Sequence, residues 1–391
     1  MADLRWRDRR RHVACVVEAV DPHRVISVDA QRPDWPLADA DLGPTVTWAE
    51  LAGQASVERS STLPADLAAS IDRRLASARL AMRSPAVAAA VVYKGELAHV
   101  SCVGAADVFP LAAAHRRCGL RIGSITKTIT AIAVMRLVER GVIDLDAPAN
   151  SLLNQTRITC EVPGAAPVTV RHLLTHTAGL PRNREGFDIA VPSDQPLPPL
   201  GEFYGPEFAS VRPPGQREYS NDGYGLLALL VEDVTGERFE DHLIGNVFEP
   251  LGMHDTGCED EPRTADCYRG LDVRCGVVAT APATRDATRG GGSVVTTIED
   301  LATYVRALMS HDGLPGLLGH RDGIRVFESR EAFGEHIGYF TGGMYGAQAD
   351  IRFAPGRDIG IAVFANVYSR YSGALFTSAS HQILGDLLAA G

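Results

Sequence analysis

A serine and a lysine three residues apart are the side chains in this chain best suited to chemistry. Ser124 and Lys127 stand in the stretch Arg121-Ile-Gly-Ser-Ile-Thr-Lys, and Lys127 is one of only two lysines in the sequence. Arginine could not replace it as a base, because a guanidinium stays protonated whereas a buried lysine can lose its proton near neutral pH. A neutral Lys127 could accept the Ser124 proton, and Ser124 could then attack a carbonyl and form an acyl-enzyme.

A second motif, Tyr219-Ser-Asn221, could complete this chemistry. A phenol beside a lysine can share the role of base, and the Asn221 amide could hold Lys127 and a substrate carbonyl or amide together. Tyr-x-Asn alone is a common pattern. Its value as evidence depends on the elements that would bring Tyr219 to Ser124.

Apolar periodicity predicts helices and strands at both chain ends, with a helical, loop-rich middle. Helices are expected at 63–80, from Ser124 to Gly141, at 224–234, after Thr297, where Asp300 fits a capping box, and at 375–388. Strands are expected at 13–20, 24–28, 86–93, 97–103, 349–353 and 359–366. At a helix N-terminus Ser124 would lie in the positive end of the helix dipole, with Lys127 on the same face.

Two segments depart from this pattern. Residues 1–60 contain all three tryptophans, at positions 6, 35 and 48, and are expected to form an extension of unassigned role that packs on the rest of the chain. Residues 191–215 hold seven prolines and are expected to be irregular. Phe203 and Tyr204 in this loop could line an acyl pocket or simply pack.

Composition narrows the classes of function. A hydrophobic content of 45% and a charged content of 22% are ordinary for a soluble globular protein, and the net charge of −10 argues against nucleic-acid binding. We find no secretory signal and no apolar run of about 18 residues, so neither export nor a membrane partner is expected. Seven scattered cysteines without a Cys-x-x-Cys pair favour free thiols in the cytoplasm.

Taken together, the motifs resemble the class C β-lactamase-like serine hydrolases, a superfamily of β-lactamases, DD-peptidases, esterases and acyltransferases. The matching stretches keep the family's order and spacing over about residues 64–391, and they are 122–127, 168–180, 214–215, 219–224, 248–253, 291–292, 341–343 and 346. The resemblance implies an α+β fold for the catalytic domain, 61–391. An antiparallel sheet flanked by helices would come from about 61–123 and 286–391, and a mostly helical region from about 124–285.

The resemblance also implies a role for each site residue. Ser124 would be the nucleophile, Lys127 its base partner, Tyr219 the second base and proton shuttle, and Asn221 the anchor of substrate and lysine. The backbone N–H groups of Ser124 and Gly343 would form the oxyanion hole.

The third motif departs from the family, which has Lys or His followed by x-Gly. The spacing to Gly346 and Asn366 places this substrate-binding motif at Phe340-Thr341-Gly342. Phenylalanine cannot attract a substrate carboxylate. His336-Ile-Gly matches the letters but misses the spacing to the next strand, so we prefer Phe340.

A pair of histidines, His172 and His176, has the i, i+4 spacing of some metal sites. No Glu follows the first histidine, as it would in a zinc protease motif, and the resembling family uses this segment structurally. Neither a metal nor another cofactor is expected.

These features predict a cytoplasmic serine transacylase or esterase that acts on a small ester, thioester or amide, for instance in specialised metabolism. Its partners would be a small-molecule acyl donor and, for transfer, an amine or alcohol acceptor. The first alternative is a true β-lactamase or D-amino-acid peptidase. The second is a non-catalytic ligand-binding protein on the same scaffold.

Overall fold

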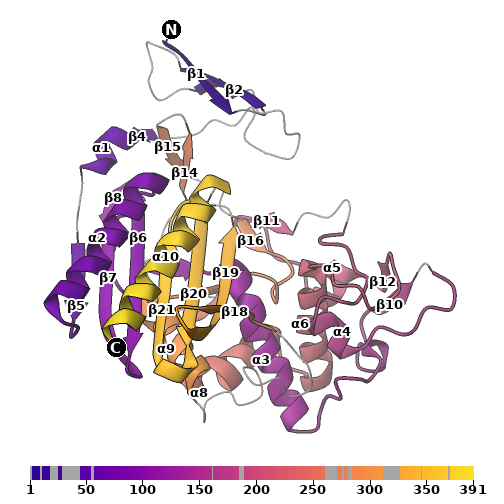
Figure 1. Ribbon diagram of the computed structural model, residues 1–391. Coiled ribbons are helices and arrows are strands. Elements are labelled where there is room, and N and C mark those ends of the chain that lie inside the picture. The colour runs from indigo at the N-terminus through magenta and orange to yellow at the C-terminus, as the bar shows by residue number, and fades with distance from the viewer. Residues whose placement is uncertain are drawn as a thin grey trace.

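An antiparallel sheet lies at the centre of the computed structural model, which describes residues 2–8, 11–17, 25–28, 45–53, 57–160, 162–184, 189–259, 271–274, 277–280, 284–310, 326–344, 346–368 and 370–391 (Figure 1). Within these residues the strand order is β18-β19-β20-β21-β6-β7-β5, with β8 paired to β7. The strands are β5 (Val57–Ser61), β6 (Ala86–Tyr93), β7 (Glu96–Val108), β8 (Leu111–Ala113), β18 (Glu328–Ala332), β19 (Glu335–Met344), β20 (Ala347–Ala354) and β21 (Ile359–Ala365). The first and last parts of the chain therefore meet where β6 pairs with β21.

Helices cover both faces of this sheet. Helices α2 (Ala65–Met82) and α10 (Arg370–Ala390) pack on one face, and α9 (Ile298–Met309) packs on the other (Figure 1). Alternate β6 residues point into two apolar clusters, Val87 and its i+2 neighbours toward α2 and Ala88 and its neighbours toward α9. A strand buried on both faces reads as a continuous apolar run, which is why 86–93 was recognisable from sequence.

A mostly helical region lies beside the sheet, in rose and magenta in Figure 1. It contains α3 (Thr126–Glu139), α4 (Val170–Leu174), α5 (Leu200–Tyr204), α6 (Asn221–Thr235), α7 (Phe239–Leu243), the π-turn η3 (Ile244–Phe248) and α8 (Glu249–Leu251). Helix α3 is buried along most of its length, because α6, α7 and η3 pack around it. The predicted fold class, an antiparallel sheet flanked by helices with a helical second region, is confirmed.

Short strand pairs lie outside the central sheet. They are β9 (Leu120–Arg121) and β13 (Gly257–Cys258) on either side of β17 (Val294–Thr296), β10 (Arg157–Cys160) with β12 (Glu207–Ser210), and β11 (Ala190–Pro192) with β16 (Thr284–Asp286). The pairs of β13 with β17 and of β11 with β16 join the helical region to the rest of the chain. The segment 191–215 was predicted to be irregular, and this is wrong in part. It contains most of β11 together with α5 and β12, because its prolines stand at the ends of these short elements.

The beginning of the chain forms two small sheets. Strands β1 (Ala2–Asp8), β2 (Arg11–Val17) and β3 (Val25–Val28) pair with one another, and β4 (Thr45–Thr47) pairs with β15 (Val277–Thr280), which pairs with β14 (Leu271–Arg274). Helix α1 (Trp48–Ala52) follows β4. The side chain of Trp6 and all of Trp35 lie outside what the structure describes. The division at residue 60 stays a prediction, although β5 crosses it and pairs with β7.

Among the helices that the structure describes, none has both the length and the apolar character needed to cross a membrane.

Candidate active site

Ser124 lies at the junction of the sheet and the helical region. It sits in the 3₁₀ turn η1 (Gly123–Ile125), between β9 and the start of α3, and its side chain is half-buried. Gly123 has a φ of +51°, and a Cβ there would lie 2.9 Å from the backbone nitrogen of Gly343. Glycine at position 123 therefore allows both the left-handed turn and the close approach of β19 to Ser124.

The two expected bases lie on either side of the Ser124 hydroxyl. Lys127 Nζ is 3.4 Å from Ser124 Oγ, and Tyr219 Oη is 2.8 Å from the same atom. Lys127 is only 1% exposed, as the first turn of α3 carries it into the core. Either base, when deprotonated, is placed to accept the hydroxyl proton.

A glycine-rich turn at 290–292 holds Lys127. The lysine ammonium donates to the Gly291 carbonyl at 2.6 Å, and Thr130 Oγ1 donates to the Gly290 carbonyl at 2.9 Å. A Cβ on Gly290 would collide with the Tyr224 carbonyl, and one on Gly292 with the Asp286 carboxylate. The glycines at these positions thus let a backbone carbonyl reach the lysine.

His176 forms one wall of the Tyr219 site. Its ring stacks on Tyr219 with 4.5 Å between centroids, and its Nδ1 accepts a hydrogen bond from the Ser220 backbone N–H at 3.2 Å. Burial, together with the charges of Lys127 and nearby arginines, lowers the pKa of His176 to about 3. The imidazole is therefore neutral at neutral pH and serves as a packing surface and an acceptor.

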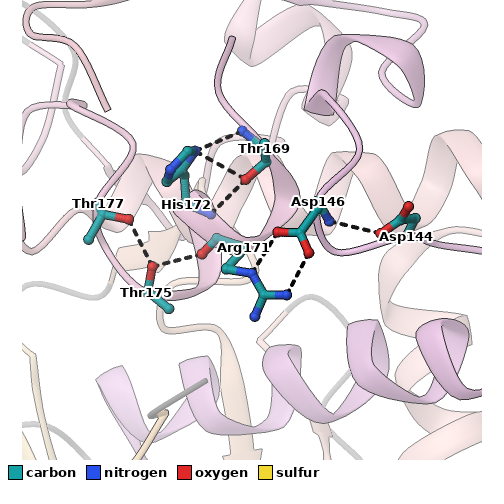
Figure 2. Close-up of polar contacts among 7 residues, drawn as sticks. All are labelled: Asp144, Asp146, Thr169, Arg171, His172, Thr175 and Thr177. Carbon is teal, nitrogen blue, oxygen red and sulfur yellow. Dashed lines mark hydrogen bonds and ion pairs between the residues drawn. The ribbon is translucent and has the colours of Figure 1, made fainter. Parts of the chain in front are cut away.

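His172, the other histidine of the pair, caps α4 instead of facing His176. Figure 2 shows its ring turned back to Thr169, with Nδ1 at 3.1 Å from the Thr169 nitrogen. Arg171 pairs with Asp146 from the outer side of the same turn. Within the described residues, no group of three His, Cys, Asp or Glu side chains could hold a metal ion.

Asn221 lies near the site but makes a different contact from the one expected. Its side-chain nitrogen donates to Asn183 Oδ1 at 2.7 Å, and no hydrogen bond to Lys127 is present in the described residues. The expected role as anchor of substrate and lysine stays a prediction, and the hydrogen bond that Lys127 makes in the structure is to the Gly291 carbonyl. Asn183 was missed by sequence reasoning. Its position just after the matching segment 168–180 was the signal that could have found it.

The third motif lies on β19, against the nucleophile turn. A Cβ on Gly342 would collide with the Ile122 carbonyl, and its distance to the Ser124 nitrogen would be 3.1 Å. Gly343 and Thr341 are exposed, and the Tyr368 ring lies against Gly343. The β19 backbone at Gly342 and Gly343 thus lies against the backbone of Gly123 and Ser124, and the oxyanion hole expected from the Ser124 and Gly343 N–H groups stays a prediction.

Phe340 precedes this contact by two residues on the same strand. It packs against the main apolar cluster, edge-to-face with Phe327 at 6.3 Å between centroids. His336 lies near the start of β19, roughly 20 Å from Gly342 along the extended strand. It is exposed there and pairs with Glu331. The glycine of the Phe340 motif, Gly342, is therefore the one that lies beside Ser124.

Buried carboxylates support the site from behind. Glu259 accepts hydrogen bonds from Arg121 Nε and from the Asp286 nitrogen, both at 2.6 Å. Burial raises the pKa of Glu259 to about 7 and that of Asp222, at the start of α6, to about 6. The Glu259 hydrogen bonds join the end of β13 to β9, which precedes the Ser124 turn, and to β16, whereas Asp222 bonds to the Arg184 nitrogen.

Phe203 and Tyr204, two aromatic residues of the proline-rich segment, differ in burial. Tyr204 is fully buried and packs edge-to-face on Phe208 at 5.6 Å. Phe203 is half-buried against the Arg184 guanidinium. Tyr204 thus packs and does not line a pocket.

Comparison with known proteins gives a consistent assignment. The family model described as Beta-lactamase matches residues 71–377. A beta-lactamase of Escherichia coli (strain K12) is 28% identical over 224 residues, which are 57% of this chain and 56% of that protein. Esterase EstB of Burkholderia gladioli is 30% identical over 209 residues, covering 49% of this chain and 52% of the esterase. The chain spans between about a third and somewhat more than half the length of the first curated relatives it matches.

Solved structures share the fold. A beta-lactamase/D-alanine carboxypeptidase from Yersinia pestis, complexed with citrate, superposes with a TM-score of 0.65 at 20% identity, over 83% of this chain and all of the other. At this level of identity the likeness concerns the fold alone.

Proposed function

The chain belongs to the beta-lactamase family, and from this premise we propose that it is a serine acyl-transfer enzyme with an acyl-enzyme intermediate on Ser124. The observation that carries the proposal is the position of Ser124 Oγ, 3.4 Å from Lys127 Nζ and 2.8 Å from Tyr219 Oη. Its substrate would be a small ester, thioester or amide, and water, an amine or an alcohol would take the acyl group.

In the proposed reaction the Ser124 proton passes to Tyr219 or Lys127 while Oγ bonds to the substrate carbonyl carbon. The backbone N–H groups of Ser124 and Gly343 hold the negative oxygen that forms. The leaving group departs with a proton from Tyr219. The acceptor then gives a proton to Tyr219 or Lys127 and bonds to the acyl carbon. Ser124 Oγ leaves this carbon and takes the proton back.

Two further features support the choice of substrate and setting. Phe340 and Phe327 place an aromatic surface where a cation would attract a carboxylate, so neutral esters fit better than anionic β-lactams. The seven cysteines of the sequence are scattered and include no Cys-x-x-Cys pair, which supports the proposed cytoplasmic setting. The similarity to the E. coli beta-lactamase keeps β-lactam or D-amino-acid peptide hydrolysis as the second candidate.

The test is intact-protein mass spectrometry after reaction with a fluorophosphonate and with nitrophenyl esters. The wild type should gain one adduct that maps to Ser124, and the ester adduct should turn over. Ser124→Ala should remove it without loss of folding. Ser70→Ala, on α2 across the sheet, is the matched control and should label normally. Labelling that persists in Ser124→Ala contradicts the proposal, and a wild type that never labels points to a binding scaffold.

The substrate class is tested by Phe340→Lys. A charge-assisted hydrogen bond contributes about 1.5–3 kcal/mol, so the variant should gain roughly one to two decades of kcat/KM toward anionic penicillins and cephalosporins. Phe340→Met changes shape without adding charge and should not show this gain. Efficient cephalosporin hydrolysis by the wild type would instead favour the β-lactamase candidate. Adding an amine acceptor distinguishes transfer from hydrolysis, because transfer gives an amide and hydrolysis gives a free acid.

A further inference from the structure

Arg182 presents a positive charge to the phenol of Tyr219. Its guanidinium carbon lies 4.9 Å from the centre of the Tyr219 ring, and the side chain is exposed. Among the described residues no carboxylate forms an ion pair with it. Arg182 comes from the segment between Leu180 and α6, far in sequence from the motif on β19.

The backbone around Arg182 is tied to the start of α6. The Arg182 carbonyl accepts from the Asn221 nitrogen at 2.9 Å, and the Arg184 nitrogen donates to Asp222 Oδ2 at 2.7 Å. Asn183 is bonded to the Asn221 side chain at 2.7 Å. Because Tyr219 immediately precedes the same helix, these bonds fix the origin of the Arg182 side chain relative to the phenol.

Of the other titratable groups around Tyr219, Lys127 is a cation close to the ring, two are neutral, and Arg217 is paired with a carboxylate. Lys127 Nζ, from α3, lies 5.0 Å from the ring centre. His176 is neutral because burial lowers its pKa to about 3, and burial raises the pKa of Tyr224, on α6, so that it is neutral as well. Arg217 is engaged by Glu328 of β18, at 2.9 Å.

On the β19 side of the site, Phe340 offers no charge. We propose that Arg182 is a positioning residue for proton transfer, which adds a second cation to Lys127 beside Tyr219 and so stabilises the phenolate that accepts the Ser124 proton. The inference rests on the proposed function, since it concerns acylation of the same serine.

The experiment follows the rate of Ser124 acylation by an uncharged nitrophenyl acetate as a function of salt concentration. Arg182→Gln should be two- to fivefold slower than the wild type at low salt. Arg182→Lys, which keeps the charge, should recover most of the rate. Raising the salt concentration to about 1 M should bring the wild type toward Arg182→Gln, because the charge is exposed.

The matched control is Arg330→Gln. Arg330 is also an exposed arginine over a tyrosine ring, Tyr339, at 5.6 Å, and its removal changes the net charge equally. It should leave the profile unchanged. Melting temperatures of all variants show whether folding is retained.

Three outcomes overturn the inference. A loss in Arg182→Gln that Arg182→Lys does not recover, or that is equal at every salt concentration, would mean that Arg182 only supports the loop. A loss seen only with an ester that carries a carboxylate would mean that Arg182 binds substrate, and an unchanged profile would mean that it does neither. By contrast, a wild type that is not acylated at Ser124 overturns the proposed function itself, and this inference with it.

Discussion

At the scale of single residues, Lys127 carries the most specific chemical expectation. It is buried at 1% exposure and donates to the Gly291 carbonyl at 2.6 Å. Lys127→Arg should lose nearly as much acylation rate as Lys127→Ala, about three decades each, because neither side chain can accept a proton. The measurement is the stopped-flow acylation rate with a nitrophenyl ester.

Lys94 is the only other lysine of the chain and provides the control. It lies exposed in the turn between β6 and β7, so Lys94→Arg should react like the wild type. If Lys127→Arg kept most of the rate, Lys127 would act as a fixed cation and Tyr219 would be the base.

Sequence analysis identified the side chains that surround Ser124, but not the groups that contact those side chains. Ser124 and Lys127 were named from their types and spacing, and Tyr219 gained its weight from the family resemblance. The structure places Lys127 Nζ and Tyr219 Oη within 3.4 Å of Ser124 Oγ. The partner of Lys127 is a backbone carbonyl, which has no residue-type signature, and so it was missed. Arg182 was missed because its contact with Tyr219 depends on a loop path that apolar periodicity does not describe.

At the scale of elements, the contact of β19 with η1 should tolerate no added atoms. Gly342→Ala would push its Cβ into the Ile122 carbonyl, and η1 and β19 would have to separate. We expect a loss of more than about tenfold in acylation together with a lower melting temperature, since overpacking costs about 1–3 kcal/mol. Gly356→Ala is the control, because the nearest atom would be 3.7 Å away and it should behave like the wild type. Full activity of Gly342→Ala would contradict the assigned oxyanion hole.

The strands behind the nucleophile should respond to pH through Glu259. Burial raises its folded-state pKa to about 7 from 4.5, so the folded protein holds this proton at pH values where the unfolded chain releases it. Its contribution to stability is complete below about pH 4.5 and is lost as the pH rises through 7. Glu259→Gln does not titrate, so its free energy of unfolding should be further below that of the wild type at pH 5 than at pH 8. Urea unfolding of both proteins at the two pH values measures this, and a constant difference would contradict it.

Elements with strong apolar patterns were placed well from sequence, and polar or short ones were not. The helix expected at 224–234 is α6, which begins at Asn221 because Ser220 accepts from the Gly223 nitrogen. The capping box expected at Thr297 is half-formed. Thr297 accepts from the Asp300 nitrogen, but the Asp300 carboxylate bonds to Thr256. Strand β5 was not predicted, since Val-Glu-Arg-Ser-Ser has the composition of an exposed edge.

At the scale of the whole molecule, α1 should unfold together with the sheet. Leu51 of α1 packs with Ala105 and Val108 of β7, and Trp48 lies under the Arg79 guanidinium at 5.6 Å. In a variant with Trp6→Phe and Trp35→Phe, Trp48 is the sole reporter. Its emission maximum should be blue-shifted in the native protein and should move red at the same urea concentration as the loss of circular dichroism. An earlier red shift would show that α1 detaches first.

The pairing of β6 with β21 has a consequence for how the protein is made. A ribosome completes the β6–β7 hairpin early, but the strand that covers the second edge of β6 is Ile359–Ala365, which comes far later in the chain. At about 5–20 residues per second, that edge stays open for on the order of ten to fifty seconds. An open edge as apolar as Ala86–Tyr93 invites pairing with other nascent chains. Added chaperone, which covers such an edge until Ile359–Ala365 is made, should therefore raise the yield of folded protein more than any change at the active site.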